Sequence, residues 1–128
     1  MNTSLSLVAR VLLASIFLIS GARQIMAFGM VSGMMAGKGF PMASVFLALA
    51  IILDIAGGIM LIANWNARYA AWALAAFTLL VGAIFHGFWN FAGAEYNNEF
   101  NHFLKNVALA GGLLMVAAAT PDADAEVA

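Results

Sequence analysis

The sequence predicts an all-α integral membrane four-helix bundle, because two features of its composition point the same way. Of the 128 residues, 65% are apolar and only 9% are charged, whereas soluble domains carry about 25% charged residues. The few charges also divide the chain into four apolar stretches, each close to the roughly 20 residues that a membrane-spanning helix needs. Such a chain cannot cover a soluble core with polar side chains, so the bilayer is its expected solvent.

The four expected spans follow these apolar stretches. Their boundaries are 5–21, 42–63, 69–89 and 102–119, and an acidic tail follows at 120–128. None of the stretches alternates apolar and polar residues as the strands of a membrane barrel do, so each is expected to be a helix. The whole chain, 1–128, is expected to form a single transmembrane domain.

The connections between the spans differ in character. Gly29, Gly33 and Gly37 recur every four residues in the long segment 22–41. This segment is either a short interfacial helix with a glycine face against a neighbour, or a flexible loop. Residues 64–68 form a tight polar turn, whereas 90–101 mix aromatic and acidic side chains and should lie ordered at headgroup depth.

Charge balance and cysteine content exclude several functions. Five Lys and Arg against six Asp and Glu give a formal charge of −1, so no basic surface is available for nucleic acid. The absence of cysteine excludes disulfides, thiol redox motifs, iron–sulfur ligation and cysteine-bound zinc within this chain. If the protein takes part in thiol or sulfur chemistry, a partner or a soluble substrate must therefore supply the sulfur.

Two ionisable residues lie inside the spans, Arg10 in the first and Asp54 in the second. Each shares a helix face with small residues, which mark helix contacts in membranes. Their depths agree within about 6 Å at 1.5 Å rise per residue. The sequence therefore predicts a buried ion pair, which either fixes the register of the helices or serves as a proton or ligand handle.

A second polar group lies on the opposite side of the bundle, where the third span ends and the fourth begins. Its candidate ligand-binding residues are His86, Trp89, His102 and Asn106. They match no metal-ligand spacing, so no metal site is predicted. They could instead provide hydrogen bonds for the carbonyl oxygens of a quinone beside an aromatic pocket, or simply be satisfied interfacial residues. The two histidines should approach within about 10 Å, because consecutive antiparallel helices with a short connection are neighbours.

The order of these residues resembles the DoxX family of small four-helix membrane proteins over nearly the whole chain. The segments that carry the resemblance are 10–13, 17–21, 39–41, 54–58, 67–68, 85–89, 102–106 and 111–114. Two positions depart from the family pattern: Arg23-Gln24 stands where a lysine is usual, and Asp54 stands where a glutamate is usual. The resemblance implies a membrane subunit in sulfur or oxidative-stress metabolism, without establishing catalysis.

The combined prediction is a membrane subunit of a redox complex that is linked to quinone. The alternatives are a small transporter or channel, and a non-catalytic scaffold that docks soluble partners. The expected location is the bacterial cytoplasmic (inner) membrane, with the termini in the cytoplasm because Arg68 lies in the shortest connection. The expected partners are the lipid bilayer, a quinone, soluble redox proteins and a second copy of the chain.

Overall fold

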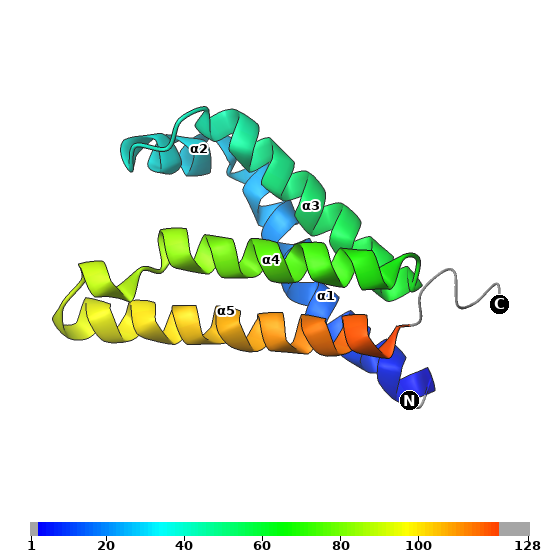
Figure 1. Cartoon of the computed structure of the whole chain (residues 1–128). Helices are drawn as coiled ribbons and strands as arrows, with labels where there is room; N and C mark the ends of the chain where they lie inside the picture. Colours follow the sequence, from blue (N-terminus) through cyan, green and yellow to red (C-terminus); the bar gives the residue numbers. More distant parts are fainter. Residues whose placement is uncertain (1–2, 121–128) are drawn as a thin grey trace. The chain divides into compact units, whose positions relative to one another are not determined.

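The protein is helical throughout the part that the structure, a computed structural model, describes, residues 3–120 (Figure 1). Its helices are α1 (Thr3–Met26), α2 (Phe28–Gly37), α3 (Ala43–Ala63), α4 (Ala67–Phe85), the 3-10 turn η1 (Phe88–Asn90) and α5 (Gly93–Ala119). Within this range four helical segments, those containing α1, α3, α4 and α5, are long and apolar enough to cross a membrane. The all-α prediction is confirmed, with the four long helices that a membrane four-helix bundle requires.

The observed boundaries refine those expected from hydropathy. The last helix, α5, begins at Gly93 rather than at residue 102, and α4 ends at Phe85 rather than at 89. Most of the expected connection 90–101 is therefore helical. The acidic tail lies, from residue 121 on, outside the described residues.

The chain divides into two compact units between Trp65 and Asn66. The first unit contains α1, α2 and α3, and the second contains α4, η1 and α5. The single domain expected for residues 1–128 stays a prediction.

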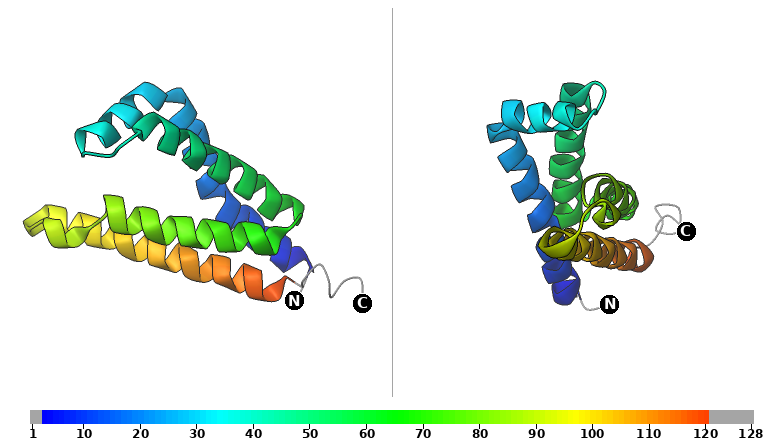
Figure 2. Two further views of the ribbon diagram at one scale, coloured as in Figure 1. Left: turned by 45° about the horizontal axis from the view of Figure 1, so that its top comes forward. Right: turned by 90° about the vertical axis from the view of Figure 1, so that its left-hand side faces the viewer.

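In the first unit, α1 and α3 run antiparallel and α2 crosses between their ends (Figure 2). Glycines let the two long helices approach closely. A Cβ atom on Gly58 would lie 2.8 Å from Leu18 Cδ2, and one on Gly21 would lie 2.6 Å from Ile55 Cδ1. Small residues at the contact thus replace the side-chain layer that would otherwise separate the helices.

The short helix α2 occupies part of the long connection, so the helical alternative for that segment is confirmed. Its glycine face, however, is not packed as expected, because a Cβ atom on Gly29, Gly33 or Gly37 would meet nothing within 4 Å. The buried side chain of α2 is that of Met35. The glycines Gly29 and Gly33 line an open depression of about 450 Å³ between α2 and the start of α3.

In the second unit, α4 and α5 run antiparallel and side by side (Figures 1 and 2). Gly82 allows the close approach near one end, since a Cβ atom there would lie 2.9 Å from Asn106 Nδ2. The residues between α4 and α5, from His86 to Ala92, include η1 and reverse the direction of the chain. This return brings the end of α4 against the first turns of α5.

Candidate functional site at the end of the α4–α5 pair

The central residue of the candidate site is His86, which lies immediately after the last residue of α4. Its backbone N–H still donates to Gly82 O at 3.0 Å, so the side chain leaves the helix end in a fixed direction. The ring stacks on that of His102 from α5, with centroids 4.8 Å apart and planes at 20°. The prediction that the two rings approach each other is confirmed.

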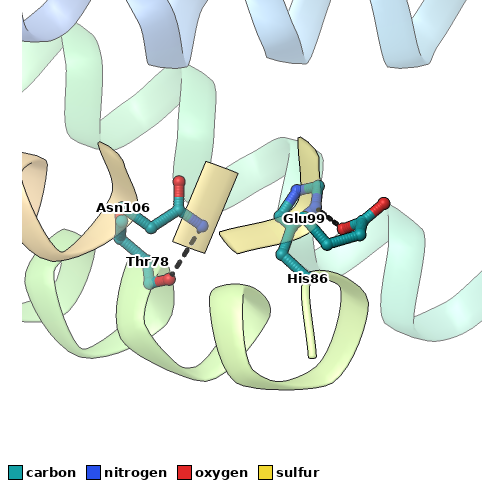
Figure 3. A network of polar contacts seen from close by, with 4 residues as sticks. All are labelled: Thr78, His86, Glu99 and Asn106. Atoms are coloured by element: carbon teal, nitrogen blue, oxygen red, sulfur yellow. Dashed lines mark hydrogen bonds and ion pairs between the residues drawn. The ribbon is translucent and has the colours of Figure 1, made fainter. Parts of the chain in front are cut away.

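Glu99 is the polar partner of His86. Its Oε2 lies 2.7 Å from His86 Nδ1, as Figure 3 shows. A carboxylate accepts and an imidazole N–H donates, so this contact is suited to an Nδ1–H···Oε2 hydrogen bond. The other ring nitrogen, Nε2, takes no part in it. Both side chains are partly exposed, at 31% for His86 and 20% for Glu99, so a ligand can reach them.

An aromatic cluster is built from residues that neighbour the two histidines in the sequence, and it is centred on Phe88 of η1. Four rings meet Phe88 edge-on at centroid distances from 4.8 to 5.5 Å. These rings belong to Trp89, Tyr96, Phe100 and Phe103. Trp89 itself is 58% exposed, so it presents an accessible aromatic surface at the edge of the cluster.

Asn106 is positioned differently from the other three predicted ligand residues. Its Nδ2 donates to the backbone oxygen of Thr78 at 3.4 Å (Figure 3), and the amide packs against Gly82. The amide therefore joins α5 to the backbone of α4, one helical turn deeper than His102. Of the predicted ligand residues, the structure brings His86 and His102 together, places Trp89 in the aromatic cluster and directs Asn106 to the helix contact.

Glu99 and Phe88 were not among the predicted site residues. Hydropathy placed Glu99 in a loop, whereas it lies in α5, three residues before His102. Residues three apart share a helix face, so the spacing of Glu99 and His102 was the available signal once the helix start was known. Phe88 was expected only as one of several rings in the aromatic pocket beside the histidines, and its central position depends on the return of the chain through η1. Among residues 3–120, no group of three or more His, Asp or Glu side chains has the geometry to hold a metal ion.

The predicted ion pair of the first unit does not form in the structure. Arg10 is buried, at 7% exposure, but its Nη1 donates to Leu61 O at 2.8 Å and to Ile62 O at 3.0 Å. Asp54 lies opposite Gly21 instead, with its Cβ 3.4 Å from the position of a Cβ on that glycine. The register of α1 against α3 is the reason, because the seven residues from Asp54 to Leu61 span about 10 Å.

Arg10 instead completes the end of α3. The last carbonyl groups of a helix have no partner within it, and a cation is favourable there because the helix dipole is negative at its C-terminus. Arg10 also shares a longer contact, Nε to Ser6 Oγ at 3.4 Å, within its own helix. One buried guanidinium thereby connects the start of α1 to the end of α3.

Comparison with known proteins agrees with this architecture. The family model described as DoxX matches residues 5–87. The inner membrane protein YphA of Escherichia coli (strain K12) is 29% identical over 93% of this chain and 85% of its own length. The inner membrane protein YqjF of the same organism is 34% identical over 91% of this chain and 85% of its own length. No solved structure matches the chain. The length of the family match and the near-complete coverage of both relatives show that the chain belongs to the DoxX family.

Proposed function

We propose that this chain is the membrane subunit of a redox complex in the bacterial inner membrane, and that it binds a quinone at His86. The inner-membrane location is supported by the names of the two relatives and by the four apolar helices. The observation that carries the quinone site is the His86–Glu99 contact, stacked on His102 beside the Phe88 cluster. As the family resemblance implies, the complex would act in sulfur or oxidative-stress metabolism.

The polar residues of the site fit a quinone headgroup. A quinone carbonyl needs a hydrogen-bond donor, and His86 can donate from Nε2 when its ring is protonated. Glu99 accepts from Nδ1 and so holds the His86 ring in one orientation. His102 covers one face of the ring, while Trp89 and Phe88 supply apolar surface for the quinone ring and tail.

Proton transfer is the chemistry that this chain would contribute. Reduction of a quinone to a quinol takes up electrons and an equal number of protons. His86 would deliver a proton from Nε2 to a carbonyl oxygen and then recover one from solvent, since imidazole is the side chain most often used for proton transfer. The electrons would come from a soluble redox partner, because the sequence has no cysteine to carry thiol chemistry.

A binding titration tests this proposal directly. The chain has three tryptophans, so a variant with Trp65→Phe and Trp72→Phe leaves Trp89 as the only tryptophan fluorophore. We expect a short-chain ubiquinone analogue to quench it saturably in nanodiscs. His86→Phe should weaken binding about tenfold or more, since a hydrogen bond to a charged donor contributes roughly 1.5–3 kcal/mol.

Two glutamates on α5 provide a matched control. Glu99→Gln removes the charge beside His86 and should weaken binding, whereas Glu95→Gln changes an exposed residue one turn away and should not. Quenching that rises linearly and equally in every variant would show only partitioning of the quinone into lipid, and would overturn the proposal. Solute flux in liposomes would then favour a transporter, and co-purified soluble partners without quinone binding would favour a scaffold.

A further inference from the structure

Asp54 is a buried acidic group to which the proposed quinone site assigns no role. It lies near the middle of α3 and is only 3% exposed. No hydrogen bond or ion pair joins it to another described residue. An ionised carboxylate without a partner is costly in an apolar environment, so this side chain requires an explanation.

The charged residues on the helices of the first unit do not neutralise Asp54. On α1 these are Arg10, which is bound to the carbonyls of Leu61 and Ile62, and Arg23, which is exposed. The helix α2 has no ionisable residue, and Asp54 is the only one on α3. The helices that pack against Asp54 therefore offer it no cation.

Gln24 of α1 has a buried polar atom that lacks a hydrogen-bond donor. Its Oε1 is buried and accepts no hydrogen bond from the described residues. Gln24 lies one turn beyond Gly21, the residue that faces Asp54. A buried acceptor of this kind needs a donor, because leaving it unsatisfied destabilises the folded protein.

The antiparallel arrangement directs the two side chains toward each other. Side chains of a helix lean toward its N-terminus. Gln24 therefore leans back along α1 toward Gly21. Asp54 leans along α3 toward residues 50 and 51, which lie opposite Gln24 in this register. From this register we expect both polar groups to lie in the same part of the α1–α3 contact.

We propose that Asp54 is a proton-binding site inside the membrane span, and that its protonated carboxyl donates to Gln24 Oε1. The proton removes the charge from Asp54 and supplies the donor that Gln24 lacks, so one bound proton satisfies both residues. This site belongs to the first unit and stands independently of the quinone site, whose residues all belong to the second.

Infrared spectroscopy of the protein in nanodiscs tests the proposal. A protonated carboxyl has a C=O stretching band separate from the bands of carboxylates and amides. We expect this band at neutral pH in the native protein, with a shift when the protein is labelled with carbon-13 at the aspartate side chain. We expect it to disappear in Asp54→Asn and to remain in Glu95→Gln.

Gln24→Leu tests the hydrogen bond, and it should move the band without abolishing it. Absence of the band from the native protein, or its persistence in Asp54→Asn, would overturn the proton site. An unchanged band in Gln24→Leu would overturn the role of Gln24. Isotope labelling requires no substitution, so the first result holds even where a variant fails to fold. Loss of quinone binding would leave this band unaffected, so the two proposals fail separately.

Discussion

Arg10 shows how one side chain can connect two distant parts of a membrane chain. Its guanidinium bonds carbonyl groups that lie 51 and 52 residues away in the sequence. Planar, delocalised Arg is suited to this task, since it offers several donors in a fixed geometry while remaining charged. Removing it would leave the end of α3 without these partners.

Arg10→Leu should lower the free energy of unfolding by roughly 1.5–3 kcal/mol, the range for hydrogen bonds to a charged group. Arg10→Lys should recover part of this loss, because one ammonium group can still donate to a carbonyl. Unfolding in mixed micelles, followed by circular dichroism, measures both effects.

The same measurement in a double-mutant cycle tests the register. Arg10→Leu and Asp54→Asn should add within about 0.5 kcal/mol, as expected for residues without a shared contact. A coupling energy of several kcal/mol would instead reveal the direct ion pair that the sequence predicted.

At the residue scale, the sequence predicted which polar residues lie inside the spans better than it predicted which residues they contact. Arg10 and Asp54 were recognised as charges within spans, but helix depth alone does not determine which turns meet. That register depends on the glycines at 21 and 58, where an added Cβ would lie only 2.6 Å from Ile55 Cδ1 and 2.8 Å from Leu18 Cδ2. The approach of His86 and His102 was predictable because a short connection restricts both ends.

At the element scale, hydropathy identified the long helices but not where α5 begins. The residues from Gly93 to Asn101 are largely polar, so they give no membrane signal although they are helical. Phe88 explains part of their order, since its ring contacts Tyr96 and Phe100 in the first turns of α5. The segment is therefore an extension of α5 beyond its apolar part, supported by aromatic contacts.

Phe88→Ala should loosen this extension. Each edge-on aromatic contact contributes about 0.5–1.5 kcal/mol, so amide exchange over 93–101 should accelerate about tenfold or more. Hydrogen exchange with mass spectrometry gives the rates. Phe91→Ala is the matched control, because Phe91 is exposed and has no ring contact among the described residues. Equal acceleration in both variants would argue against the role of Phe88.

At the scale of the whole molecule, four crossings place alternate connections on opposite sides of the membrane. Because the chain has no native cysteine, a single introduced cysteine is the only thiol of each variant. Its labelling therefore shows on which side of the membrane that position lies. Ser4→Cys and Trp65→Cys should react with an impermeant maleimide from one side, expected to be the cytoplasm. Lys38→Cys and Ala92→Cys should react from the other. Labelling of Ala92→Cys from the same side as Trp65→Cys would contradict the crossing of α4.

The capping of α3 by Arg10 has a consequence for the biogenesis of the protein. The ribosome delivers α1, with its arginine, before the carbonyl groups of Leu61 and Ile62 have been synthesised. An arginine within a nascent span raises the free energy of insertion by up to about 2.5–3.5 kcal/mol. Until α3 is synthesised, α1 therefore carries this charge without its two carbonyl partners. The hairpin of α1 and α3, rather than α1 alone, supplies the contacts that Arg10 makes in the folded protein.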